Sequence, residues 1–200
     1  MANVSRPQGL KPVGYLNGSP WNGQARKYYV PATNATALYV GDPVTLGGSG
    51  DAQGVPSVSI GVAGSAVVGV VVGVVVANAG TSLQAGVLDL TRRSLPALTE
   101  GYVLVADDPN IIFEIQSGQT VPLAATDIGL NCNFLIAAGS STTGDSGTTT
   151  AVAAPAATAT LNLKLIGLAQ REDNAFGAFA KWLVKINNHV YGTGTGTAGI

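Results

Sequence analysis

The sequence predicts an all-β protein, a sandwich or barrel with an extended N-terminal arm. From Ala37 onward, short apolar runs alternate with turn residues, whereas helical periodicity extends nowhere beyond about two turns. Glycine accounts for 27 of the 200 residues, and only 10% of the residues are charged, against roughly 25% in an ordinary soluble domain. This composition excludes disorder driven by excess charge, and the length fits one domain with arms.

Residues 1–41 are predicted to form the arm, because they combine four prolines with four basic residues and no acidic one. The next segment, residues 42–160, holds nine acidic residues and two basic ones, and residues 161–200 are basic again. We interpret the basic residues of the arm either as a solvated face or as a contact with an acidic protein surface. The candidate partner-binding residues are Arg6, Lys11, Arg26, Lys27, Tyr28 and Tyr29.

Residues 42–191 are predicted to form a β-rich body. The turn cluster at residues 107–110 predicts a hairpin between the two runs that flank it. In the second of these runs, Glu114 and Gln116 are expected on the polar face. The best helical candidate is the segment 174–181. The predicted strands cover residues 37–40, 44–46, 102–105, 111–116, 159–165 and 182–187.

The most hydrophobic segment, residues 60–77, is long enough to cross a membrane, yet its composition favours strands. Valine dominates it, glycine recurs every few residues, and both are poor helix formers. Its flanks carry neither lysine and arginine nor tryptophan and tyrosine as membrane anchors. We expect two or three short buried strands, broken at Gly64, Gly69 or Gly73, and no membrane partner.

Two segments of low complexity are predicted to lie outside the core. Residues 140–160 consist almost wholly of Ser, Thr, Gly, Ala and Pro, and residues 192–200 repeat Gly-Thr. A mobile loop and a flexible tail are favoured over roles in partner contact.

Few catalytic or metal-site templates fit a chain with one histidine and one cysteine. His189 is predicted to be a surface or hydrogen-bonding residue, and Cys132 lies in an apolar run typical of a buried, inert thiol. Asp107, Asp108 and Asn110 could offer oxygen ligands to calcium, but turn formation explains them without a metal. We therefore predict no catalytic residue, no cofactor and no metal.

The net charge of −1 gives the chain no overall basic field for binding phosphates. Residues 26–29 do combine basic and aromatic side chains, as proteins that bind single-stranded nucleic acid do. We nevertheless expect no nucleic-acid partner. The N-terminal residues lack the apolar core of a signal peptide, so synthesis in a cytoplasm is expected.

Four blocks of the sequence, in a fixed order, resemble head proteins of tailed bacteriophages known as capsid cement, stabilising or decoration proteins. They are VLVADDPN at 103–110 with FEIQ at 113–116, DIGLN at 127–131, STTGDSG at 141–147, and REDN at 171–174 running on to KWLVKINNH at 181–189. The run of Ser, Thr and Ala after Gly147 departs from the family, in which a more acidic and apolar segment is expected.

The resemblance implies a non-enzymatic, jelly-roll-like β protein that binds the outside of the major capsid protein lattice. It implies a homo-oligomer, a trimer or a dimer, on the exterior of the virion, made in the cytoplasm of the host. A tail or receptor-binding protein of the virion is the main alternative, although fibres usually carry repeats or heptads, which this chain lacks. A small hydrolase that depends on His189 and a small membrane pore are the other two alternatives.

Overall fold

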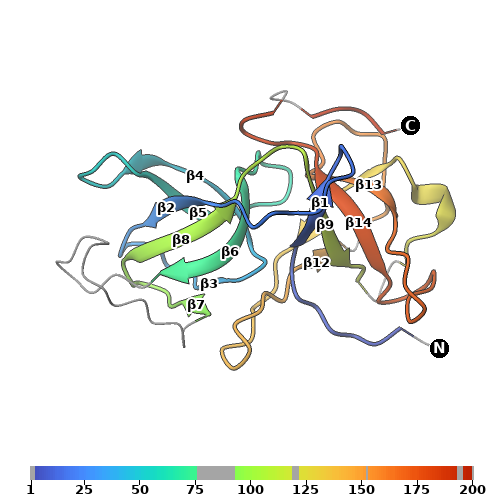
Figure 1. Ribbon diagram of the computed structural model, residues 1–200, viewed down its shortest axis with the longest axis horizontal. Helices are drawn as coiled ribbons and strands as arrows, with labels where there is room; N and C mark the ends of the chain where they lie inside the picture. The colour runs from blue at the N-terminus through green and yellow to red at the C-terminus, as the bar shows by residue number, and fades with distance from the viewer. Residues whose placement is uncertain (1–2, 76–92, 119–121, 152, 193–195, 200) are drawn as a thin grey trace.

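The computed structural model describes residues 3–75, 93–118, 122–151, 153–192 and 196–199, and it confirms the all-β prediction (Figure 1). Two β lobes lie side by side, and each has its own hydrophobic core. The only helical segment among the described residues is the short 3-10 helix η1 (Ala125–Asp127). A jelly-roll order of strands, which the resemblance implies, stays a prediction.

The first lobe is a closed barrel of five strands. Valines supply most of its interior, because a β-branched side chain packs well on a pleated surface. The strands β2 and β5 meet in parallel where Tyr29 faces Ser57, and the other barrel pairs are antiparallel. Two short strands, β3 and β7, pair separately. In the order around the barrel, the strands are β2 (Arg26–Val30), β5 (Pro56–Ile60), β4 (Pro43–Gly50), β6 (Gly69–Val75) and β8 (Gly101–Ala106); β3 is Leu38–Tyr39 and β7 is Ser94–Leu95.

The second lobe is an antiparallel sheet of five strands. Along β14, Trp182, Val184 and Ile186 are buried while the residues between them are partly exposed, which confirms the predicted alternation. Next to the sheet, two short strands, β11 and β12, pair with each other. The order across the sheet is β1 (Lys11–Tyr15), β9 (Ile111–Gln116), β14 (Lys181–Ile186), β13 (Leu163–Leu168) and β10 (Asn131–Cys132); β11 is Phe134–Leu135 and β12 is Thr149–Thr150.

The predicted hairpin around residues 107–110 is wrong, because its two strands belong to different lobes. β8 pairs with β2 and β6 in the barrel, whereas β9 pairs with β1 and β14 in the sheet. The turn itself forms as expected, since the Asp108 side chain accepts a hydrogen bond of 2.7 Å from the Asn110 backbone N–H. The turn therefore carries the chain from the barrel to the sheet.

The hydrophobic segment contributes β6, so the strand prediction is confirmed over Gly69–Val75. β6 continues through Gly73 with an irregular register against β8, while residues 61–68 form a loop. Residues 76 and 77 lie outside the described part. No helix of the described residues has the length and hydrophobicity that a membrane crossing requires.

The segment 174–181, the best helical candidate, is not a helix. Residues 174–180 form a loop, and Lys181 begins β14. Gly177 and Phe179 have φ angles of 138° and 60°, which no right-handed helix contains.

Residues 3–41 are extended, but most of them belong to the two lobes rather than to a separate arm. β1 is an edge strand of the sheet, and β2 is part of the closed barrel. Leu10, Tyr28 and Val30 are buried. The expected boundary at residue 41 therefore does not separate an arm from a body. The sequence did not indicate this, because charged neighbours hide the apolar alternation of these residues. Residues 3–9, which we call the strap, lead to the buried Leu10 and then to β1 at Lys11.

The low-complexity segments are packed over much of their described length. Ser146, Thr148 and Thr150 are almost fully buried, so residues 140–151 are not the loose loop that was expected. In the tail, the Thr197 backbone N–H and hydroxyl both donate hydrogen bonds to the Asn187 side chain, at 3.0 and 3.1 Å. The described tail residues 196–199 are therefore held against the sheet lobe.

Candidate partner-binding surface

The six candidate partner-binding residues fall into two groups. Arg6 lies in the strap and Lys11 begins β1, so both belong to the sheet lobe. The other four are consecutive on β2 in the barrel. The structure therefore gives two candidate surfaces instead of one continuous basic arm.

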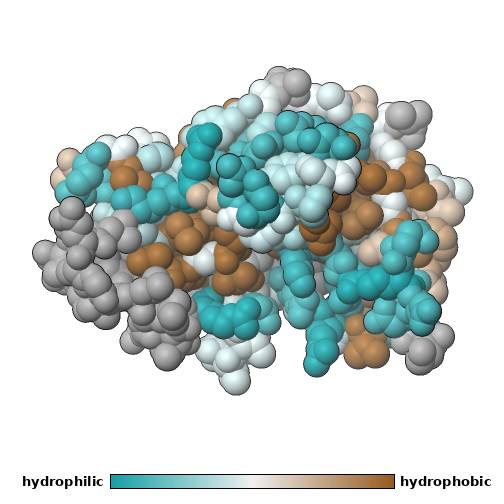
Figure 2. Space-filling model, viewed as in Figure 1, coloured by the Kyte–Doolittle hydropathy of each residue, from teal (hydrophilic) through white to brown (hydrophobic). Residues whose placement is uncertain are grey.

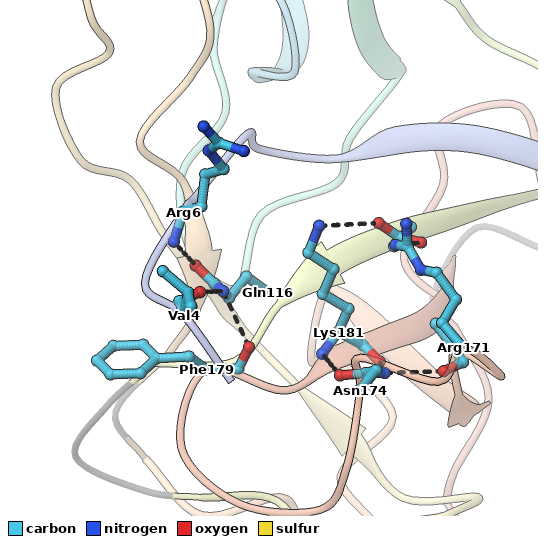
Figure 3. A network of polar contacts seen from close by, with 9 residues as sticks. Val4, Arg6, Gln116, Arg171, Asn174, Phe179 and Lys181 are labelled. Atoms are coloured by element: carbon cyan, nitrogen blue, oxygen red, sulfur yellow. Dashed lines mark hydrogen bonds and ion pairs between the residues drawn. The ribbon is translucent and has the colours of Figure 1, made fainter. Parts of the chain in front are cut away.

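The carboxamide of Gln116 makes three hydrogen bonds that fasten the strap to the sheet lobe (Figure 3). Its Nε2 donates to the carbonyl oxygens of Val4 and Phe179, at 2.8 and 2.9 Å, and its Oε1 accepts from the Arg6 backbone N–H at 2.8 Å. Gln116 is only 4% exposed because the strap covers it. A primary amide suits this position, since it offers two donors and an acceptor in one plane.

Further amide side chains fasten the strap and the loop beneath it. Asn3 donates to the carbonyl oxygens of Ala175 and Ala178 and accepts from the Ala175 backbone N–H. Within the loop, Asn174 bonds to the backbone of Ala169 and Lys181 at 2.8–2.9 Å. The position of the strap thus depends on hydrogen bonds much more than on apolar burial, because Val4 is 74% exposed.

A cluster of cations surrounds Glu114 beside the strap. Glu114 forms ion pairs with Arg171 and Lys181, and Lys11 faces it across the β1–β9 ladder. Arg6 and Lys11 are exposed and form no ion pair within the part of the chain that the structure describes. Both are therefore available to a negatively charged partner.

On β2, Tyr28 is the one candidate that the structure removes from the surface, since its ring is 2% exposed inside the barrel. Its hydroxyl donates to Asp107 at 2.8 Å and lies 3.4 Å from the hydroxyl of Tyr191. Burial is the main cause that raises the pKa of Tyr28, and both hydrogen bonds add to it. Arg26 pairs with the same carboxylate at 3.4 Å and remains largely exposed.

Lys27 and Tyr29 point to the outside of the barrel, as alternation along β2 requires. Their common neighbour is Tyr102 on β8: the Lys27 Nζ lies 4.8 Å from the centre of its ring, and the Tyr29 ring lies 5.7 Å from it. The Tyr102 hydroxyl donates to Asp51 at 2.7 Å, which raises the pKa of Tyr102 to about 12. These contacts form a small aromatic surface whose nearest charges have both signs.

His189 and Cys132 are both buried. The Nδ1 of His189 accepts the Tyr191 backbone N–H at 3.0 Å, and its buried Nε2 contacts no acceptor among the described residues. Burial lowers the pKa of His189, which favours a neutral ring. Cys132 lies in the core of the sheet lobe, where burial raises its pKa to about 12, so its thiol stays protonated.

The calcium alternative rested on Asp107, Asp108 and Asn110. Asp107 is engaged by Tyr28 and Arg26, and the Asp108 side chain closes the turn. Within the described ranges, no group of three or more His, Cys, Asp or Glu side chains gathers in a way that could hold a metal ion.

Sequence reasoning missed the residue that organises this surface. Gln116 was expected on the polar face of its strand beside Glu114, and only the strap makes that face buried. A glutamine among exposed strand residues carries no signal for such a role. Trp21, which is partly buried beside the core of the sheet lobe, likewise lies in a segment without apolar periodicity.

Comparison with known proteins gives no relative, since no family model, no curated protein sequence and no solved structure matches this chain.

Proposed function

We propose that this chain is a structural virion protein that binds the outside of the major capsid lattice and stabilises a phage head. The observation that carries the proposal is the ordered series of sequence blocks that resembles capsid cement and decoration proteins. The blocks supply most of β9 and all of β14, and DIGLN ends at Asn131, the first residue of β10, so part of the resemblance lies in three strands of one sheet. VLVA at 103–106 lies instead in β8 of the barrel, and STTGDSG at 141–147 lies in a loop.

The character of the surface supports a binding role. Several large apolar side chains are exposed on the described surface, including Val62, Leu98, Leu135 and Phe176, at 45–68%. Few charges have to lose water when such a surface is covered, so large contacts with a lattice or with further copies cost little desolvation energy. Leu98 has a φ of 57°, an unfavourable angle for leucine, and it is held there by a backbone hydrogen bond of 2.7 Å to Asn34.

A cement protein needs only modest contact energy for each copy. Many copies bound to one shell act together, because each new contact forms at the high effective concentration that the lattice provides. The buried positions of His189 and Cys132 are in keeping with this role, since neither side chain is offered to a substrate.

The test is the copy number of this chain in purified virions, measured by quantitative mass spectrometry against the major coat protein. A ratio of one copy per coat subunit, or a simple fraction of it, is expected. A handful of copies per particle would move the protein to the portal or the tail, and absence from virions would overturn the proposal. Release of the chain by mild protease treatment of intact heads would place it on the exterior.

A further inference from the structure

Three hollows follow the strap and β1 along the sheet lobe. The first has a volume of about 450 Å³ and shares Arg6 and Lys181 with the second, which is much smaller, at about 10 Å³. The second shares Gln8 and Lys11 with the third, whose volume is about 410 Å³. Because neighbouring hollows share lining residues, they adjoin one another, and we call the second and third together the strap groove.

The far end of the strap groove has an apolar floor. Leu10, Trp21, Val71 and Val72 line it, in the hollow that residues of β1 and β6 share. Figure 2 shows hydrophobic residues gathered over the region of β6, beside hydrophilic ones over the region of β1. Trp21 and Val72 are only partly buried, so a partner side chain could contact both.

The indole of Trp21 lacks a partner for its N–H. Its Nε1 is inaccessible to solvent and has no acceptor among the described residues. An unpaired buried donor costs free energy on the order of 1–3 kcal/mol, so a hydrogen bond to it is worth more than one formed at an exposed site. A carbonyl oxygen of a bound chain would supply the missing acceptor after a small rotation of the ring.

The charges along the strap groove favour an anion. Arg6, Lys11, Lys181 and Arg93 line it, and only Glu114 and Asp145 oppose them. Glu114 is already paired with Arg171 and Lys181, and Asp145 is paired with Arg93 at 3.2 Å. Arg6 and Lys11 are therefore the positive charges of the groove that have no acidic partner among the described residues.

From this arrangement we infer that the strap groove binds an extended acidic segment of a protein partner, with one large apolar side chain on Trp21 and Val72. Its acidic side chains meet Arg6 and Lys11, and one of its carbonyl oxygens accepts the Trp21 N–H. The inference rests on the proposed function for its partner, since the segment then belongs to the coat protein, and it specifies which surface of the chain and what chemistry make the contact.

The first experiment measures binding without any virion. The full chain is titrated with a capped peptide of sequence Asp-Glu-Leu-Glu-Asp at low salt, and heat and Trp fluorescence are recorded. Saturable binding to the wild-type chain is expected, with affinity lost by about tenfold in Lys11→Glu and several-fold in Trp21→Phe, which keeps an aromatic ring, although a smaller one, and removes the indole N–H donor. Lys185→Glu, on β14 and outside the lining of the strap groove, is the matched control and should bind as the wild type does.

Two outcomes of this titration would overturn the inference. One is no saturable binding at up to about 1 mM peptide, and the other is equal binding of a Lys-Arg-Leu-Arg-Lys peptide. If Lys11→Glu instead abolishes self-association of the chain, the groove holds a second copy, and the coat-protein assignment is wrong.

The second experiment separates the inference from the proposed function. Heads lacking this chain are mixed with the wild type, Lys11→Glu and the control Lys185→Glu, and bound protein is measured after sedimentation. Loss of at least about tenfold for Lys11→Glu alone supports the groove. If all three bind equally, the inference fails while the proposed function stands, and if the wild type does not bind at all, the proposed function fails.

Discussion

The Ser146 hydroxyl donates a hydrogen bond of 2.5 Å to the carboxylate of Asp42, across 104 residues of sequence. The Tyr39 backbone N–H donates to the same carboxylate at 2.8 Å. Asp42 is 2% exposed and has no cation beside it among the described residues. Burial raises its pKa, and this outweighs the hydrogen bonds, which lower it.

Asp42→Asn is expected to change the pH dependence of stability. Because the pKa of Asp42 is higher in the folded than in the unfolded chain, its contribution is complete below the unfolded value of about 4 and is lost as pH rises through the folded value. The wild type should therefore lose free energy of unfolding relative to Asp42→Asn as pH rises. Urea unfolding of both proteins from pH 3.5 to pH 8 measures this, and a constant difference would contradict it. Asp42→Ala should cost about 2–3 kcal/mol at pH 3.5, because buried hydroxyls lose their acceptor, and the cost should become smaller as pH rises and the wild type loses stability.

His189→Asn should show the opposite slope. Burial lowers the pKa of His189 in the folded state, so stability is lost as pH falls from the unfolded value of about 6.5 through the folded value. Asparagine keeps an acceptor for the Tyr191 N–H but does not titrate. Unfolding curves between pH 4.5 and pH 8 should show the wild type losing stability relative to the variant on the acid side. Parallel curves would mean that His189 titrates alike in both states.

Gln116→Ala should release the strap. The substitution removes three hydrogen bonds that join Val4, Arg6 and Phe179, and the expected loss of stability is about 1–3 kcal/mol. Hydrogen exchange at the Arg6 amide should become faster, because this N–H loses its acceptor on Gln116. Gln170→Ala is the matched control, because Gln170 is exposed and, among the described residues, its side chain bonds only to the nearby Leu168 carbonyl. Equal protection of the strap from hydrogen exchange in both variants would show that the Gln116 side chain does not hold the strap in place.

Cys132 should resist thiol reagents in the folded protein. Its side chain is 2% exposed, and its pKa is raised to about 12, so thiolate is scarce at pH 8. A chromogenic disulfide reagent should label it only at the rate of unfolding, and should label it fully in denaturant. Rapid labelling of the native chain would contradict the buried position.

Truncation after Gly192 should destabilise the protein, although the removed residues look dispensable in the sequence. It deletes Thr197, whose carbonyl accepts from Asn131 at 2.7 Å and whose N–H and hydroxyl bond to Asn187. Because both asparagine side chains are buried, the loss should be about 1–3 kcal/mol by thermal or urea unfolding. Unchanged stability would show that the tail contributes no net energy.

The strands of this chain could be predicted where local pattern decides them. The valine-rich run of β6 is typical of a strand buried on both faces, and the alternation of Trp182, Val184 and Ile186 is typical of a strand buried on one face. Neither pattern depends on which strand lies next to it in the sheet. The division into two lobes could not be predicted, since the turn at residues 107–110 reverses the chain but does not determine which strand pairs with which. Pairing depends on contacts between residues far apart in sequence.

The candidate surface, like the fold, could be predicted where local sequence decides and not where distant contacts decide. Charge and exposure at Arg6 and Lys11 follow from composition, and both are exposed. Tyr28 was misplaced because the charges of Arg26 and Lys27 hide an inward-facing position on β2. Gln116, Ser146 and Thr148 are polar residues that become buried only through distant partners, so single-sequence patterns assign them to the outside.

The barrel strands all lie between β1 and β9, which are neighbours in the sheet and face each other at Tyr15 and Ile111. The barrel is thus inserted into what would otherwise be a simple hairpin. During translation, its strands emerge consecutively and can close on one another, whereas β1 must wait for Ile111 to leave the ribosome before its own ladder can form. A folding intermediate with a finished barrel and an unpaired β1 edge is the expected nascent state.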